Sequence, residues 1–232
     1  MSPINTSAAL ARADTNLFAR CHLCRILWYF VIGSVLGCIF ETTMTLARTG
    51  QLTRRTGLLY GPFNTIYGVG AVALYLLFGW LSLSPKGWRE AAAVFLAGAV
   101  ACSALEYGAS WLQESAFGTR SWDYSQRLFN INGRVCLMSF LAWGALSVAW
   151  VWFVQPFFER LFLITPQWLG VPLSAAVFAL LLADAGLTLA AMIRWCERTR
   201  GIANNADWAR WIDLRYPDEV MRSVFPNMRF LN

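Results

Sequence analysis

Five long blocks of apolar residues constrain the fold of this chain more than any other feature of its sequence. A helix needs about 20 mostly apolar residues to cross the hydrocarbon core of a bilayer, and every block is long enough. The composition agrees, because 57% of the residues are hydrophobic and only 14% are charged, whereas a soluble domain carries about 25% charged residues. We therefore predict an all-α fold: a polytopic integral membrane helical bundle with about five transmembrane helices. The expected spans are residues 26–47, 58–80, 91–112, 135–154 and 171–193.

Polar segments flank this transmembrane domain. A polar arm, residues 1–25, precedes it, and an Arg-rich tail, residues 194–232, follows it. Residues 207–215 are expected to form a short amphipathic helix within the tail. With the N-terminus outside, the cytoplasmic segments hold 13 Lys and Arg residues and the opposite side holds 6. Because basic residues concentrate on the cytoplasmic side, we predict a multi-pass protein of the cell membrane with its N-terminus outside and its C-terminus in the cytoplasm.

The sequence argues against several classes of function. The formal net charge is +6, but Arg beside membrane spans is expected on topological grounds, and no basic cluster interleaved with aromatic residues suggests nucleic-acid binding. The close pair Cys21 and Cys24 flanks the only histidine, His22. That spacing fits neither haem attachment nor a zinc site. We therefore expect no nucleic-acid partner, no metal and no cofactor.

Three acids lie inside the expected spans: Glu41, Glu106 and Asp184. A charge near the bilayer centre costs about 2.5–3.5 kcal/mol on insertion scales, so an acid at such a position is a candidate functional group. At 100° per residue, Glu41 shares a helix face with Ser34 and Gly37, and Glu106 shares one with Ser110. These faces favour interior positions. The alternative is that each acid is a neutral, hydrogen-bonded member of a packing seam. We favour a functional role for Glu41 and Glu106, whereas for Asp184 the two interpretations are balanced.

The direction of the chain predicts where these acids meet. The first, third and fifth spans run the same way across the membrane, and Glu41, Glu106 and Asp184 each lie in the later part of their span. All three are therefore expected near one membrane face. The polar loops at residues 57–63 and 113–134 open on the same face, which the count of basic residues makes cytoplasmic.

Two segments at that face carry distinctive motifs. Gly61-Pro62 resembles a helix start whose free N–H groups favour an anion or another acceptor, and the alternative is a bent, tightly packed helix start. In the longer loop, Asp123 and Arg134 are expected to pair, and Asn132-Gly133 suits a turn just before the fourth span. Arg134 can instead be a topological anchor at the membrane surface.

The chain carries several distinctive blocks in order: Phe40-Glu41, residues 57–71, Glu106-Tyr107 with Glu114, Trp122-Asp123-Tyr124-Ser125 and Asn130-Ile131-Asn132-Gly133-Arg134. These blocks resemble the bacterial membrane family of ABC-transporter type IV proteins, also called CmpB-like permeases. The resemblance covers about residues 27–150 and implies a permease. It departs from the family pattern at Thr65, where a Pro is expected, and at Arg55-Thr56-Gly57, which splits an Arg-Gly pair. The residues taken as candidates for binding or function are Glu41, Glu106, Tyr107, Glu114, Asp123, Tyr124, Asn130, Asn132, Arg134 and Asp184, with a loop motif of Gly57, Tyr60, Gly61, Pro62, Tyr67, Gly68 and Gly70.

These features favour a permease-like membrane subunit of a transport system, with an interior acidic site near the cytoplasmic face. The chain has no G-x-x-x-x-G-K-[ST] motif, so a separate ATPase subunit would have to supply ATP hydrolysis. Five spans per chain also suggest pairing with another subunit or a second copy. Two alternatives stay open: a membrane-embedded enzyme or sensor for a lipid or lipid-linked substrate, and a non-catalytic structural or regulatory membrane protein. No catalytic residue is assigned.

Overall fold

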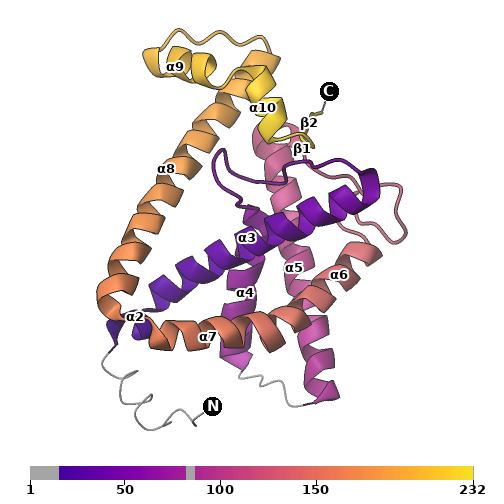
Figure 1. Ribbon diagram of the computed structural model, residues 1–232. Coiled ribbons are helices and arrows are strands. Elements are labelled where there is room, and N and C mark those ends of the chain that lie inside the picture. Colours follow the sequence, from indigo (N-terminus) through magenta and orange to yellow (C-terminus); the bar gives the residue numbers. More distant parts are fainter. Residues whose placement is uncertain (1–15, 82–86, 232) are drawn as a thin grey trace.

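The computed structural model describes residues 16–81 and 87–231, and it confirms the expected all-α membrane bundle. Residues 1–15 of the predicted N-terminal arm lie outside the described residues, as does Lys86, which entered the charge count. In chain order the elements are α2 (Leu17–Arg20), α3 (His22–Thr49), α4 (Thr65–Leu81), α5 (Trp88–Phe117), β1 (Thr119–Arg120), α6 (Leu137–Ala149), η1 (Trp150–Val154), α7 (Gln155–Ile164), α8 (Gln167–Thr199), α9 (Asp207–Arg215), α10 (Asp218–Val224) and β2 (Arg229–Phe230) (Figure 1).

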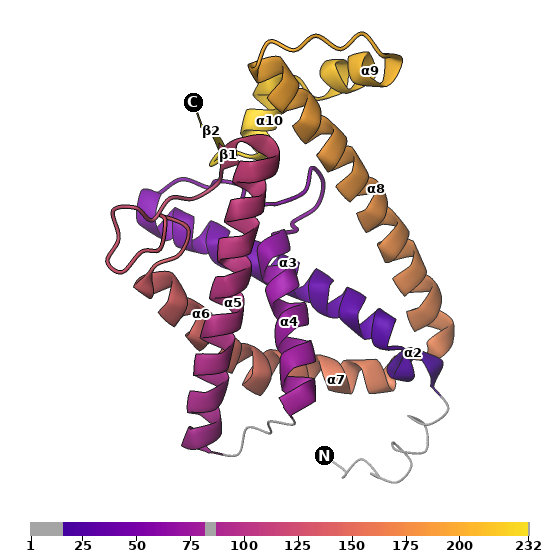
Figure 2. The same ribbon diagram turned by 180° about the vertical axis from the view of Figure 1, so that it is seen from behind.

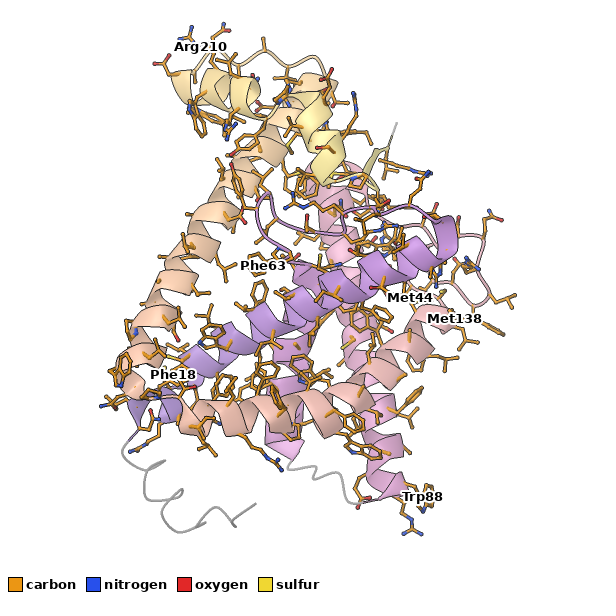
Figure 3. All side chains as sticks on the ribbon, in the orientation of Figure 1. Phe18, Met44, Phe63, Trp88, Met138 and Arg210 are labelled. Carbon is orange, nitrogen blue, oxygen red and sulfur yellow. The ribbon has the colours of Figure 1, made fainter. Side chains whose placement is uncertain are left out.

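Four helical stretches among the described residues are long and apolar enough to cross a membrane: His22–Thr49, Trp88–Phe117, Leu137–Ile164 and Gln167–Thr199. The fifth apolar helix, α4, is shorter. The start of α5 and the C-terminal helices lie at opposite ends of the molecule, as the labels of Trp88 and Arg210 show (Figure 3). Figure 2 shows from behind that α8 and α5 both rise toward the C-terminal elements, so the two helices run in the same direction.

The second apolar helix begins later than expected. The sequence predicted helix from residue 58, whereas α4 begins at Thr65 and residues 57–64 form a loop. Gly61 adopts a left-handed conformation with φ of 68°. This conformation is incompatible with a right-handed α-helix that continues through Gly61 into Pro62. The expected helix start at Gly61-Pro62, with free N–H groups for an anion, is therefore wrong. We call residues 57–64 the inserted loop.

The fourth apolar block continues farther than expected. Residues 155–164, predicted to belong to a connector, are helical and extend α6 through the π-helical turn η1 into α7. Pro156 cannot donate a backbone hydrogen bond and would disturb a regular helix at this point. The π-turn absorbs this disturbance, because the N–H of Gln155 donates to the carbonyl of Trp150, five residues earlier.

Helices α3 and α4 pack in close contact at glycines. A Cβ atom at Gly33 would lie 2.5 Å from Cβ of Ala71 and 2.8 Å from the carbonyl oxygen of Tyr67. A Cβ atom at Gly68 would lie 2.7 Å from the carbonyl oxygen of Phe30. Distances this short exclude any side chain, so the two backbones approach as in small-residue packing between membrane helices. The Gly33 and Gly68 positions set how deeply α4 sits against α3.

The C-terminal tail folds back on the bundle. The expected helix at residues 207–215 is present as α9. Ile212 of α9 is buried against a cluster that includes Trp195 of α8 and Met221 of α10. After α10 the chain forms β2, which pairs antiparallel with β1 beyond the end of α5.

A substitution at Gly33 tests the close packing of α3 on α4. Gly33→Ala should destabilise the protein by about 1–3 kcal/mol, because backbone atoms of α4 cannot yield to the new methyl group. The matched control is Gly79→Ala in α4, where an added Cβ meets nothing within 4 Å. Thermal unfolding in detergent should show a lower midpoint for Gly33→Ala alone. Equal midpoints for the two variants would contradict the packing.

Candidate functional site

A cavity of about 710 Å³ lies among α3, α4, α5 and α8, under the end of the C-terminal tail. Its volume falls in the range of about 300–1,000 Å³ that small-molecule sites occupy. Most of the wall is apolar, and the ionisable side chains in it are two acids and two arginines. Its polar and aromatic lining residues include Glu41, Arg54, Arg55, Thr56, Asn64, Tyr67, Glu106, Gln113, Trp122, Tyr124, Trp143, Thr188 and Asn227.

Glu41 on α3 is held by Tyr67 of α4. The Tyr67 hydroxyl donates to Oε1 of Glu41 at 2.6 Å. Gly37, one turn before Glu41, makes the contact possible, because a Cβ atom there would lie 2.2 Å from Cγ of Tyr67. The absence of a side chain at Gly37 thus leaves room for the Tyr67 ring against α3, and from this position its hydroxyl reaches Glu41.

Glu106 on α5 is buried, with 6% of its surface exposed. The indole N–H of Trp143 on α6 donates to Oε2 at 3.1 Å, and the Tyr124 hydroxyl from the loop after α5 donates to Oε1 at 3.1 Å. The rings of Tyr67 and Trp143 pack with centroids 5.0 Å apart. This ring pair joins the surroundings of the two acids into one cluster.

Neither Glu41 nor Glu106 forms an ion pair within the described part of the chain, and both accept hydrogen bonds from neutral aromatic side chains. The two arginines of the wall have other partners. The Nε of Arg55 donates to Thr45 at 3.0 Å, and Arg54 donates to the carbonyl oxygens of Leu59 and Gly61 at 3.2 and 3.1 Å. None of these four charged side chains is therefore ion-paired among the described residues: the carboxylates accept hydrogen bonds from aromatic side chains, and the arginines donate to the neutral oxygens of the inserted loop and of Thr45.

Asp184 on α8 does not line the cavity and instead supports the inserted loop. The backbone N–H of Tyr60 lies 3.3 Å from both carboxylate oxygens of Asp184. One turn later, Thr188 accepts from the N–H of Leu59 at 3.0 Å and donates to Asp184 at 3.2 Å. Irregular backbone at membrane depth requires such protein partners for its polar groups. This geometry fits the interpretation of Asp184 as a hydrogen-bonded structural acid.

Arg134 pairs with Glu114 rather than with Asp123, so the expected Asp123–Arg134 pair is wrong. Its guanidinium lies 2.9 Å from Oε2 of Glu114 and over the ring of Tyr107, 5.3 Å from the centroid. Glu114 lies in the last turn of α5, and the Arg134 side chain extends to it although the Asp123 carboxylate lies beside Gly133. Asn132 donates to the Tyr107 hydroxyl at 2.8 Å, so these residues hold the loop against α5.

Asp123 has a local role in the same loop. Its carboxylate accepts from the N–H of Ser125 at 2.9 Å and lies 3.6 Å from Arg120. The hydrogen bond from the Ser125 backbone, assisted by Arg120, holds the pKa of the Asp123 carboxyl below its ordinary value. Asn130 likewise bonds within the loop, donating to the carbonyl of Arg127 at 2.9 Å.

The predicted turn at Asn132-Gly133 is present. Both residues have positive φ, 52° and 68°, and the N–H of Arg134 donates to the carbonyl of Ile131 at 3.0 Å. This is the arrangement of a type I′ turn, which favours Asn-Gly. The turn directs the chain into α6, where Cys136 caps the first turn.

The candidate residues divide into two groups. Glu41, Tyr67, Glu106, Tyr124 and Gly57 line the cavity. Gly68 serves the α3–α4 packing, and Gly61 and Pro62 shape the inserted loop. The candidates that do not line the cavity are Tyr60, Gly61, Pro62, Gly68, Gly70, Tyr107, Glu114, Asp123, Asn130, Asn132, Arg134 and Asp184.

Sequence reasoning missed Trp143, Arg55 and the tail residues of the wall. Trp143 lies in an apolar block of a chain rich in Trp, so its presence there did not mark it as a functional residue. The available signal was that a Trp inside a span needs a partner for its N–H, and a buried acid is a suitable acceptor. Arg55 was counted only as a topological charge.

Removing the carboxylate of Asp184 tests its support of the inserted loop. Asp184→Ala leaves the Tyr60 N–H without its acceptor, and a lost hydrogen bond is worth about 1 kcal/mol, or about a fivefold change in protection. Hydrogen–deuterium exchange of a peptide covering residues 57–64 should therefore become faster. Asp207→Ala is the control, because Asp207 is exposed on α9. Unchanged exchange in Asp184→Ala would show that the loop does not depend on this acid.

The comparisons with known proteins place the chain in a family. A family model described as Putative ABC-transporter type IV matches residues 28–189, which span α3 through most of α8 and include both cavity acids. No match was found among curated proteins or among solved structures. Because the match covers well over half of the 232 residues, this chain, a membrane protein related to transport, belongs to the ABC-transporter type IV family.

Proposed function

We propose that this chain is a permease-like subunit of a membrane transport system, and that its cavity receives a solute carrying a positive charge. The observation that carries this proposal is the pair of carboxylates, Glu41 and Glu106, which line one cavity and form no ion pair among the described residues. The two arginines of the same wall donate instead to the oxygens of Thr45, Leu59 and Gly61. The other acids described above have charged or backbone partners: Glu114 pairs with arginine, and Asp123 and Asp184 accept from backbone N–H groups.

The energetics favour a cation in this position. A carboxylate removed from water loses several kcal/mol of solvation unless an opposite charge compensates it. Two such groups at one cavity also repel each other. A cationic solute between them offsets both effects, and its affinity arises from the same charges that make the empty cavity unfavourable.

The aromatic wall fits the same class of solute. Tyr67, Tyr124 and Trp143 surround the acids, and Trp122 also lines the cavity. Aromatic faces attract a desolvated cation by about 2 kcal/mol or more in favourable geometries. The apolar remainder of the wall suits the organic part of the solute. We infer an organic cation, for example an amine or a quaternary ammonium compound, because the described residues offer no cluster of metal ligands.

We place the cavity toward the cytoplasmic face. Glu41 and Glu106 lie in the later parts of α3 and α5, and both helices end toward the side of the C-terminal tail (Figure 1). The excess of basic residues in that tail and in the loops beside it supports this orientation. A solute site near the cytoplasmic face suits a permease that couples to a cytoplasmic ATPase.

The first prediction of this proposal concerns the partner. Because the chain has no phosphate-binding G-x-x-x-x-G-K-[ST] motif, ATP hydrolysis would require another subunit. Extraction of the tagged protein in native nanodiscs should co-purify an ATPase that carries the motif, in fixed stoichiometry. An unrelated tagged membrane protein serves as control. If no such ATPase is enriched, the ABC-type coupling is wrong.

The second prediction concerns Glu106. Glu106→Gln removes the charge but retains the size of the side chain, and loss of one partner of a buried charge pair costs about 2 kcal/mol or more, or about 30-fold in affinity. Mass spectrometry of small molecules retained in nanodiscs should therefore find a cationic compound with the wild type and lose it with Glu106→Gln.

The matched control is Glu90→Gln, which changes the same residue type in the first turn of α5, outside the cavity. It should retain the compound. Size-exclusion chromatography of each variant checks that the protein is intact. An intact Glu106→Gln variant that retains the same compounds as the wild type would refute the proposed role of the acid.

A further inference from the structure

The end of the tail forms part of the cavity wall. Phe225, Pro226, Asn227 and Met228 line the cavity together with residues of α5 and α8. These four residues lie well beyond residue 189, where the match to the family ends. The cavity is therefore closed on this side by a segment outside the family region.

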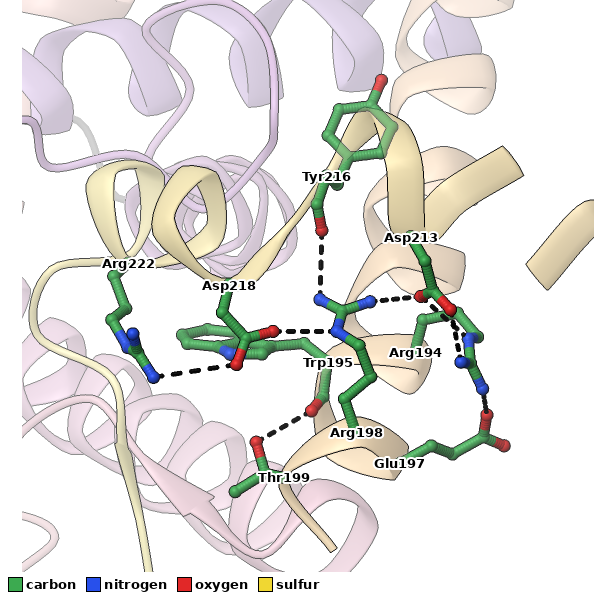
Figure 4. A network of polar contacts seen from close by, with 9 residues as sticks. All are labelled: Arg194, Trp195, Glu197, Arg198, Thr199, Asp213, Tyr216, Asp218 and Arg222. Atoms are coloured by element: carbon green, nitrogen blue, oxygen red, sulfur yellow. Dashed lines mark hydrogen bonds and ion pairs between the residues drawn. The ribbon is translucent and has the colours of Figure 1, made fainter. Parts of the chain in front are cut away.

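The tail rests on a base of ion pairs at the end of α8. Arg194, 3% exposed, pairs with Asp213 of α9 and with Glu197 (Figure 4). Arg198 pairs with Asp213 and, at 2.8 Å, with Asp218 of α10. Hydrogen bonds from Arg194 hold the pKa of the Asp213 carboxyl below its ordinary value, so this acid is charged at neutral pH.

Apolar contacts strengthen the same base. Trp195 of α8 and Met221 of α10 are almost fully buried in one cluster with Leu59 of the inserted loop. The hydroxyls of Tyr60 and Tyr216 are 2.8 Å apart. Helices α9 and α10 are thus fixed to α8 and to the inserted loop, and they hold the start of the covering segment in place.

The segment after this base is attached less firmly. Its ladder with β1 has only two residue pairs, Thr119 with Phe230 and Arg120 with Arg229. The N–H of Leu231 adds one bond, to the carbonyl of Gly118 at 2.9 Å, and the partly buried side chains of Met228 and Phe230 pack against the apolar cluster of the base. Segments held by so few contacts open locally at low cost.

We infer that residues 226–231 are a lid on the cavity, hinged on the fixed base of α9 and α10. The lid closes the side of the cavity at which α5 ends, and the short β1–β2 ladder is its latch. The inference rests on the proposed function only in that the lid would admit or retain the solute. The closure itself is a property of the cavity and can be measured without a solute.

Accessibility of a cysteine in the cavity tests the lid. Ala109 lines the cavity on α5, so Ala109→Cys reports entry of a water-soluble maleimide, with the labelled peptide quantified by mass spectrometry to distinguish it from the native cysteines. Truncation after Phe225 removes the lid but keeps the buried base. Labelling should become faster by about tenfold or more, the change that about 1.4 kcal/mol of closure free energy gives.

A disulfide between β1 and β2 would hold the lid closed in the full chain and should have the opposite effect on labelling. Cross-strand neighbours have the Cα separation that a disulfide needs, so Arg120→Cys with Arg229→Cys should cross-link the lid to β1. Oxidation should slow labelling of Ala109→Cys below that of the chain without the disulfide. Prior reduction of the same protein, followed by removal of the reductant, should restore the rate.

Arg210→Gln is the control for charge changes in the tail, because it removes only the exposed Arg210–Asp207 pair of α9. It should leave labelling unchanged. The lid is refuted if the truncated protein, with an unaltered thermal midpoint, labels at the wild-type rate, or if the disulfide does not slow labelling. Neither of these results would contradict the cation proposal. Conversely, if Glu106→Gln retained the cationic compound, the cation proposal would be wrong and the lid would be unaffected.

Discussion

The close approach of α3 and α4 is the interaction on which the rest of the structure depends. Gly33 and Gly68 exclude side chains from the contact, so α4 settles against α3 and the Tyr67 ring lies over Gly37. From there its hydroxyl reaches Glu41. Because α4 starts so close to α3, the chain before it has to turn sharply, and the inserted loop supplies that turn.

The inserted loop then connects the bundle to α8. Its N–H groups at Leu59 and Tyr60 bond to Thr188 and Asp184, so α8 stands beside the bundle with the cavity between. Helix α8 is otherwise weakly packed, with 22% of its most apolar window buried in the structure. Lipid, or a second subunit, would cover the remaining surface. Polar contacts to the inserted loop, together with the apolar cluster of Leu59 and Trp195 at the end of α8, therefore position this wall of the cavity.

The sequence predicted the helical architecture, which the structure confirms. It also predicted that Glu41, Glu106 and Asp184 lie near one membrane face, and of these three Glu41 and Glu106 line the cavity. Helical periodicity placed Glu41 and Glu106 on interior faces, and chain direction placed them near one end, so both reach the same cavity. Periodicity cannot identify a partner, and therefore Arg134 was paired with Asp123 although Glu114 is closer. The Asn132-Gly133 turn was predictable because its conformation is local. The folded tail was not, because its buried residues are spread over two short helices and a strand among seven arginines.

A thermal-shift series tests directly whether the charges of Glu41 and Glu106 select a cation. Octylammonium, octanol and octanoate share one chain and differ in charge. If the two acids do select a cation, only octylammonium should raise the unfolding midpoint of the wild type and of Glu90→Gln. The same compound should not raise the midpoint of Glu106→Gln or of Glu41→Gln. Equal stabilisation by all three compounds, or an undiminished effect of octylammonium on both cavity variants, would contradict this selection.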